Sequence, residues 1–332
     1  MTNWNLKESP ITTNILNFFE NKYCKIVAIP GLLKCCAIAS AKLANIGLPR
    51  FNVFNVAPTR QFKSVTSKEA CNFFSRNYYI ETGSDFTIFT LAKIYRDKKF
   101  NKKCLIINDG TVLFSTKSRR AKDRLVGGLA EITSDGKYTY SERIKDEFIK
   151  GDISVIMNMT LESYNKYESK LLGSTFLERF LTIFYSIPVD DLKKFNIEKS
   201  KRKLIKPPEF EFNPRIKVNN SDDDIKKIND YAENYSILSV KSLNGTFDLL
   251  LALCISHASI NGRDYIMEDE FKVLDMIKSY ITVHGNIPKI IEMRKRGYNY
   301  KKICEVLGMK YQSYKPYIIR VVKKAKERGI LK

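Results

Sequence analysis

Residues 51–64, with the sequence FNVFNVAPTRQFKS, decide how the fold is interpreted. The first six residues have the β-branched and aromatic composition of a strand, and Pro58 marks the turn that follows it. A helical run then extends from Val65 to Phe74. A strand that delivers a short loop to the start of a helix is the arrangement in which backbone N–H groups face a phosphate.

The loop carries the side chains of a degenerate phosphate-binding motif. Aligned with G-x-x-x-x-G-K-[ST], Ala57 and Phe62 stand where the glycines would be, while Lys63 and Ser64 keep the phosphate-binding lysine and the Mg²⁺-binding hydroxyl. Phe62 departs from the motif physically, because glycine lets the backbone approach phosphate closely. The residues expected to contact a nucleotide here are Ala57, Pro58, Thr59, Arg60, Gln61, Phe62, Lys63 and Ser64.

Strands and helices alternate along the first 190 residues. After 51–56, further strands are expected at 78–81, 104–109, 153–158 and 181–187, with helices at 85–96, 119–133 and 164–180 and a turn or hairpin at 136–140. Such alternation implies parallel βαβ units and therefore an α/β domain with a buried sheet. A helical lead-in at 14–47, broken at Pro30-Gly31, precedes this domain.

Polar residues end two of the expected strands. Asn108 and Asp109 stand where a nucleoside triphosphatase uses one carboxylate to hold Mg²⁺ and another to polarise water. If Asn108 takes the metal-binding place, that carboxylate is lost; if Asp109 takes it, the acid that polarises water is missing. In either alignment one of the two acids used in hydrolysis is missing, so we expect nucleotide hydrolysis to be weaker than nucleotide binding.

Asn158 ends the neighbouring strand, where an amide can orient water against the γ-phosphate. Arg179 ends the helix at 164–180, from which a guanidinium can reach a phosphate on a neighbouring subunit.

Taken in order, these motifs resemble the core of an AAA+ ATPase. The all-helical block at 222–282 resembles the lid of that family. Its Gly262-Arg263-Asp264-Tyr265, followed by Glu268-Asp269, is similar to the lid of minichromosome-maintenance helicases and related archaeal replication ATPases.

The resemblance implies an α/β fold of the P-loop NTPase (AAA+) type, with ATP and Mg²⁺ as cofactors. Ser64 and Asp109 would hold the metal, and Asp109, Asn158 and Arg179 would be the catalytic residues. The resemblance also implies a ring-shaped homo-oligomer in which Arg179 acts on the neighbouring subunit. A basic residue that senses the nucleotide is expected at the start of a lid helix, and Lys241 is the nearest match.

Residues 300–327 have helix-turn-helix spacing. A helix at 300–307 and a turn at Gly308-Met309 precede a second helix at 311–327, which begins near Ser313 instead if Pro316 must lie in a first turn. With a supporting helix at 288–296, the segment looks like an all-α winged helix with a short wing. Lys310, Lys315, Arg320 and Lys323 are expected to hold DNA phosphates, and Gln312 and Ser313 to contact base edges.

Charge, cysteine content and apolar stretches indicate the kind of partner and the cellular compartment. The chain carries 57 Lys and Arg against 36 Asp and Glu, a formal net charge of +21, which favours nucleic acid. About half of this excess lies in residues 285–332, which hold 14 basic and 3 acidic residues. The seven cysteines form no C-x-x-C pair, which is typical of reduced cytoplasmic thiols. The most apolar stretch, 26–41, is too short to span a membrane, so we expect no membrane partner.

The sequence therefore predicts a cytoplasmic, AAA+-like nucleotide-binding protein that binds DNA in replication, maintenance or remodelling, and that hydrolyses ATP if the degenerate motifs are active. The alternative is a non-catalytic DNA-binding regulator on a degenerate ATPase scaffold. The expected divisions are a helical lead-in at 1–50, a nucleotide-binding core at 51–195, a linker and helical lid at 196–282 and a winged helix at 283–332.

Overall fold

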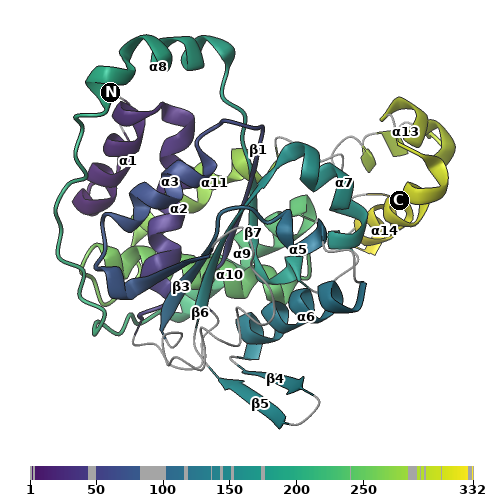
Figure 1. Ribbon diagram of the computed structural model, residues 1–332, viewed down its shortest axis with the longest axis horizontal. Helices are drawn as coiled ribbons and strands as arrows, with labels where there is room; N and C mark the ends of the chain where they lie inside the picture. Colours follow the sequence, from purple (N-terminus) through teal and green to yellow (C-terminus); the bar gives the residue numbers. More distant parts are fainter. Residues whose placement is uncertain are drawn as a thin grey trace.

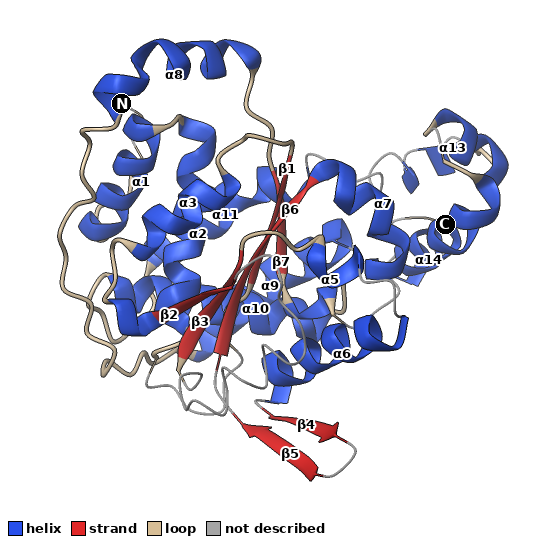
Figure 2. Cartoon of the chain, viewed as in Figure 1, coloured by secondary structure: helices blue, strands red, loops and turns tan. Residues whose placement is uncertain are grey.

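A five-stranded, all-parallel sheet lies at the centre of the computed structural model (Figures 1 and 2). The structure describes the chain except for residues 1, 3, 44–49, 83–101, 116–118, 136, 143–144, 151–152, 173–175, 240, 283–289, 292, 295–296, 308, 328–330 and 332. The strands are β1 (Val53–Ala57), β2 (Tyr79–Thr82), β3 (Lys103–Ile107), β6 (Ile153–Thr160) and β7 (Leu181–Phe184). Their spatial order is β2-β3-β6-β1-β7, which confirms the predicted parallel α/β sheet. A separate antiparallel hairpin, β4 (Lys137–Glu142) and β5 (Lys145–Lys150), stands where the sequence predicts a turn or hairpin.

Helices cover both faces of the sheet. One face carries α1 (Pro10–Lys22), α2 (Lys25–Ser40), α3 (Lys63–Cys71), α9 (Asp222–Ser239), α10 (Leu243–Ile260) and α11 (Glu268–Thr282). The other face carries α5 (Val112–Ser115), α6 (Arg119–Asp135), α7 (Leu161–Leu172) and the one-turn 3-10 helix η2 (Leu177–Arg179). The remaining described helices are η1 (Arg76–Tyr78), α8 (Val189–Arg202), α13 (Tyr300–Val306) and α14 (Tyr311–Glu327).

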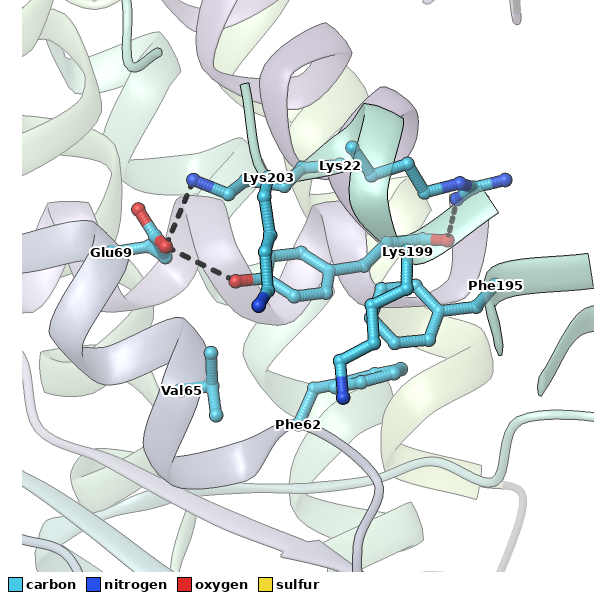
Figure 3. A pocket seen from close by; sticks show the side chains of 9 residues that line it. Lys22, Phe62, Val65, Glu69, Phe195, Lys199 and Lys203 are labelled. Atoms are coloured by element: carbon cyan, nitrogen blue, oxygen red, sulfur yellow. Dashed lines mark hydrogen bonds and ion pairs between the residues drawn. The ribbon is translucent and has the colours of Figure 1, made fainter. Parts of the chain in front are cut away.

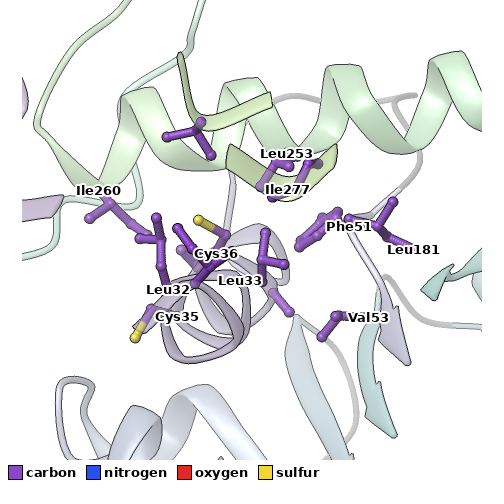
Figure 4. Close-up of a cluster of buried hydrophobic side chains, with 14 of the residues drawn as sticks. Leu32, Leu33, Cys35, Cys36, Phe51, Val53, Leu181, Leu253, Ile260 and Ile277 are labelled. Atoms are coloured by element: carbon purple, nitrogen blue, oxygen red, sulfur yellow. The ribbon is translucent and has the colours of Figure 1, made fainter. Parts of the chain in front are cut away.

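The strands are buried on both sides, as expected for a covered parallel sheet. In β1, Val53 and Ala57 face the layer that contains α2, while Phe54 and Val56 face α7, because successive side chains point to opposite faces. Figure 4 shows the α2 side chains, such as Leu33, packed between the sheet and α10. The helical lead-in and the helical block at 222–282 therefore share one core with the sheet.

Helix α2 continues through Pro30, where the sequence predicts a break. Proline removes one backbone N–H, which would have bonded to the carbonyl of Ile26. That carbonyl accepts a hydrogen bond from the Tyr280 hydroxyl at 3.0 Å instead, so the Ile26 carbonyl is not left without a hydrogen bond. Gly31 allows α1 to pack closely, because a Cβ atom there would lie 2.3 Å from the ring of Phe19.

Two further expectations differ from the structure, and a third lies outside the described residues. The helix predicted at 164–180 ends at Leu172, and Arg179 lies in η2 instead of at the end of a long amphipathic helix. The expected division between the core at 51–195 and the linker at 196–282 falls inside α8, which continues to Arg202 with acidic residues in its first turn and basic ones in its last. The helix predicted at 85–96 lies outside the described residues.

The C-terminal segment has its own small apolar core. Helices α13 and α14 pack through side chains that include Ile303, Ile318 and Val322. The second helix begins at Tyr311, and Pro316 lies exposed in its second turn, where water can satisfy the carbonyl that loses its partner. No strand is present among the described residues after 283, so the predicted wing is not seen there, and Gly308 lies outside them. The predicted pair of helices is confirmed.

Candidate functional site

The carboxyl ends of three adjacent strands meet the loop that follows β1. Strand β6 lies between β3 and β1, which confirms that the Asn158 strand lies beside the strand that leads to Asn108 and Asp109. Ile107, the last residue of β3, is opposite Met157, and Ala57, the last residue of β1, is opposite Thr160. Because all three strands run in one direction, the predicted loop and the predicted polar residues lie at the same edge of the sheet.

The loop enters α3 through an unusual backbone conformation at Phe62. This residue precedes the first helical residue with φ 61° and ψ 9°, in the left-handed region that glycine tolerates and other residues rarely adopt. The first helical hydrogen bond runs from the Thr66 N–H to the Phe62 carbonyl at 2.8 Å, so the N–H groups of residues 63–65 precede the intrahelical ladder. The backbone thus adopts at Phe62 a geometry for which a phosphate loop ordinarily uses glycine.

Lys63 folds back onto the loop itself. Its Nζ donates to the carbonyl of Ala57 at 2.8 Å and to that of Pro58 at 2.6 Å. Burial lowers the pKa of Lys63 from 10.5 to about 8, and the nearby carboxylate of Asp109 acts in the opposite direction. The ammonium group therefore lies in the loop, close to an acidic strand-end residue, and is held by carbonyl oxygens that a phosphate would have to replace.

Hydrogen bonds join α3 to the strand ends. The Ser64 hydroxyl donates to the Asn108 carbonyl at 3.2 Å. The Asn158 amide donates to Ser67 Oγ at 2.9 Å and lies 3.4 Å from Asn108 Oδ1. The structure thus brings Ser64, Asn108 and Asn158 together, as the sequence predicts.

Asp109 lies exposed in the turn after β3. Its Oδ1 accepts a hydrogen bond from the Thr111 N–H at 2.9 Å, and the next residue, Gly110, donates its N–H to the Asn158 carbonyl at 2.7 Å. One carboxylate with the Ser64 hydroxyl is compatible with Mg²⁺, which commonly binds through one or two carboxylates together with substrate phosphates and water. Within the described part of the chain, no group of three or more His, Cys, Asp or Glu side chains forms a cage for a metal ion.

Sequence reasoning missed Lys34, which supports the loop from α2. The side chain is fully buried, and its Nζ donates to the Lys63 carbonyl and to Thr66 Oγ1, both at 2.6 Å. Burial lowers the pKa of Lys34 well below its usual 10.5, and the neighbouring charge of Lys63 lowers it further. The signal was a single lysine within an apolar helix, a position that lysine rarely takes unless it has a partner.

Asn55 is a second residue that sequence reasoning missed. It lies opposite Asn158 in the β1–β6 pairing, fully buried, and neither polar atom of its side chain has a hydrogen-bond partner among the described residues. The same holds for Oδ1 of Asn158. An unsatisfied buried amide costs about 1–3 kcal/mol, and polar groups kept at such a cost are typical of functional sites. The signal was an asparagine in the middle of an apolar strand.

Arg179 and Lys241 lie at the opposite edge of the sheet. Strand β7 begins at Leu181 beside Val53, the first residue of β1, and the Arg179 carbonyl accepts a hydrogen bond from the Asn52 side chain at 3.0 Å. Lys241 is buried, and its Nζ donates to the Phe180 carbonyl. Burial lowers the pKa of Lys241 from 10.5 to about 7. Within one chain, the structure therefore does not bring either side chain to the loop.

The Gly262-to-Tyr265 motif holds the helical block against the N-terminal helix. Arg263 forms an ion pair with buried Glu270 and donates to Ser9 Oγ at 3.1 Å. Glu270 also lies 2.5 Å from His257 Nδ1, and the other ring nitrogen of His257 lies 2.8 Å from Thr12 Oγ1. These contacts give the motif a structural role in this chain.

The predicted DNA-contacting residues share the exposed face of α14. Buried Tyr317, Ile318, Val321 and Val322 occupy the opposite face of that helix. The exposed set comprises Lys310, just before the helix, and Gln312, Ser313, Lys315, Arg320 and Lys323 within it. The Tyr314 hydroxyl and Lys324 contact Asn165 and Glu178, so α14 rests on the rest of the chain through a different side.

A scan against protein-family models finds no match to this chain, and a search of curated proteins finds none. Among the described helices, α10 is long and apolar enough to cross a membrane, but 72% of it is buried inside the protein, as in a core helix.

Proposed function

We propose that this chain is an AAA+-like protein that binds ATP with Mg²⁺ at the loop after β1 and binds DNA through α14. The observation that carries the nucleotide proposal is the shared edge of β3, β6 and β1. There Lys63 and Ser64 begin a helix beside Asn108, Asp109 and Asn158. Strand order, loop position and residue type agree with one another, and the proposal rests on this agreement.

The chemistry assigned to each group follows from its place. Lys63 neutralises phosphate charge, and the N–H groups at the start of α3 add the positive end of a helix dipole. Ser64 and Asp109 would hold Mg²⁺, which would neutralise phosphate charge there. Asn158 is fully buried and donates to Ser67 Oγ, so it would sense a terminal phosphate or water through Ser67 and Asn108. Since the end of β3, at Asn108-Asp109, carries a single carboxylate, we expect binding to exceed hydrolysis.

Assembly into a ring would let Arg179 contact the nucleotide phosphate bound by the neighbouring subunit. Its edge of the sheet is opposite the loop, so in a head-to-tail arrangement the Arg179 edge of one subunit faces the loop of the next. Its Nε is buried without a hydrogen-bond partner among the described residues. An arginine that stabilises phosphate charge across an interface is a known device of nucleoside triphosphatases.

Titration with a fluorescent ATP analogue and Mg²⁺ tests the loop. We expect saturable binding that Lys63→Ala abolishes and that Lys68→Ala, an exposed lysine on the same helix, leaves intact. Phosphate favours the charged form of Lys63, whose pKa is about 8, so affinity should fall as the pH rises through about 8. Equal binding by both variants would place the nucleotide elsewhere.

One observation favours the second candidate function, a non-catalytic DNA-binding regulator. The Lys63 ammonium group is already held by two loop carbonyls, and the bulky Phe62 occupies a glycine position. If wild type and Lys63→Ala both fail to bind the analogue, the fold is a scaffold for DNA binding alone.

Duplex DNA binding is tested by salt titration. Each Lys→Ala change at Lys315 or Lys323 should reduce the slope of log K against log salt by about 0.9, whereas Lys226→Ala on α9 should not. Removal of residues 285–332 should abolish binding. Unchanged affinity in the truncated protein would refute the DNA assignment.

A further inference from the structure

We propose that a pocket beside the phosphate loop binds one nucleotide of single-stranded nucleic acid, with its base against an aromatic wall and its phosphate on Lys199 and Lys203. The pocket has a volume of about 390 Å³ and lies between the end of α1, the outer side of α3 and α8 (Figure 3). Its lining residues are Lys22, Tyr23, Phe62, Val65, Glu69, Phe195, Lys199, Arg202 and Lys203. The proposal rests on nucleic acid being the partner, but it does not require ATP at the loop.

Three aromatic rings form the wall of the pocket. The Phe62 and Phe195 ring centres lie 4.5 Å apart in an edge-on arrangement, and Tyr23 lies 5.0 Å from Phe62 and 5.9 Å from Phe195. Phe62 and Phe195 keep part of their surface exposed to solvent, whereas Tyr23 is buried. A wall of this kind stacks bases of any sequence, because every base has a π-face.

Two of the four cations in the pocket wall are already paired. Lys22 lies 3.0 Å from Glu69, and Arg202 lies 2.8 Å from Glu198 while it also donates to the Tyr23 carbonyl. Lys199 and Lys203 are exposed and make no ion pair among the described residues. Figure 3 shows both lysine side chains extending into the pocket. They are the groups that a phosphate can contact without breaking an existing pair.

The basic residues continue along the chain beyond the pocket. Lys201 and Lys206 are also exposed, so residues 199–206 present a short row of positive charge next to the aromatic wall. A basic track beside stacking rings is the combination by which proteins hold single strands. A duplex keeps its bases stacked and paired, so a base could enter a recess of this kind only after the duplex had been opened at that position.

The pocket is separate from the strand-end cluster, which consists of Ser64, Asn108, Asp109 and Asn158. Phe62, Val65 and Glu69 have helical spacing and occupy one side of the start of α3. Ser64 and Ser67 occupy the other side, where they contact Asn108 and Asn158. Of the residues that line the pocket, Phe62 alone is also part of the loop after β1. A base in the pocket therefore leaves Ser64 and the strand-end residues free for another ligand.

A labelled 15-nucleotide oligothymidylate and the full-length protein test the proposal by fluorescence anisotropy. We expect Phe195→Leu to weaken binding about tenfold and Phe195→Tyr to bind like wild type, because stacking requires a ring and not merely an apolar side chain. Lys199→Ala together with Lys203→Ala should reduce the slope of log K against log salt by about 1.4. The matched control, Lys193→Ala with Lys194→Ala, removes the same charge from α8 outside the pocket.

The same variants separate this proposal from the proposed function. Single-strand binding that is equal in wild type, Phe195→Leu and the Lys199/Lys203 variant overturns the pocket, and so does the absence of any binding by wild type. Loss of ATP-analogue binding in Phe195→Leu with unchanged oligothymidylate binding also overturns it, because the pocket would then serve the loop nucleotide. Duplex binding through Lys315 and the Lys63 titration remain independent readouts of the proposed function.

Discussion

Replacement of Phe62 separates the cost of its backbone conformation from the value of its ring. Phe62 is half-buried against Tyr23 and Phe195, so Phe62→Ala loses about half of the 3–5 kcal/mol typical of a fully buried phenylalanine, or about 2 kcal/mol. Phe62→Gly loses the same ring but relieves about 1–2 kcal/mol of left-handed strain. Part of that gain, about 0.4–1 kcal/mol, is offset by the greater freedom of glycine in the unfolded chain. We therefore expect the glycine variant to be about 1 kcal/mol more stable than the alanine variant.

Urea unfolding at 25 °C provides the measurement. Trp4 is the single tryptophan, and it is buried in the same core that Phe62 packs against, so its fluorescence reports the unfolding of this core. Wild type should be the most stable protein, followed by Phe62→Gly and then by Phe62→Ala. An alanine variant that equals or exceeds the glycine variant would refute the left-handed conformation and the comparison with a phosphate-loop glycine.

Two further predictions concern the core and the far edge of the sheet. Gly31→Ala should lower the free energy of unfolding by about 1–3 kcal/mol, because its Cβ would meet the Phe19 ring, whereas Gly127→Ala, with open space around its Cβ, should raise it by about 0.5–1 kcal/mol; equal effects in urea unfolding would contradict this packing. Lys241 has a pKa of about 7 in the folded chain and 10.5 when unfolded, so the native state binds fewer protons between these values and its stability rises with pH there. The free energy of unfolding of wild type should therefore rise more steeply than that of Lys241→Met between pH 7 and 9. Parallel pH profiles would show that folding does not lower the pKa of Lys241.

The sequence predicts the strand-end cluster well because its determinants are local. Alternating strands and helices imply a parallel sheet, and parallel strands place their carboxyl ends at one edge. Once Lys63 is placed after the first strand, Asn108 after a second and Asn158 near the end of a third, their proximity follows without knowledge of side-chain packing. The helical block at 222–282 is equally predictable from its periodic apolar residues.

The misses depend on tertiary contacts. Pro30 predicts a helix break, but the Tyr280 hydroxyl, about 250 residues away, satisfies the carbonyl that proline leaves free. Lys241 resembles a nucleotide sensor by its place before a helix, and only the position of the Phe180 carbonyl shows that it belongs to the opposite edge. Local sequence does not encode partners that are distant in the chain, so side-chain roles are less predictable than elements.

The two hydrogen bonds that Lys63 makes within the loop reduce the affinity with which a nucleotide can bind there. To contact a phosphate, its ammonium group exchanges two carbonyl hydrogen bonds, at Ala57 and Pro58, for phosphate oxygens. If each bond contributes about 0.5–1.5 kcal/mol net, the exchange reduces affinity by about 1–3 kcal/mol relative to a loop with an unengaged lysine. This penalty is independent of Phe62, since the carbonyls belong to other residues of the loop. Phe62→Gly alone should therefore not restore tight binding, and a nucleotide that binds tightly to wild type must gain more from its contact with Lys63 than this exchange costs, with the N–H groups of α3 and Mg²⁺ contributing the rest.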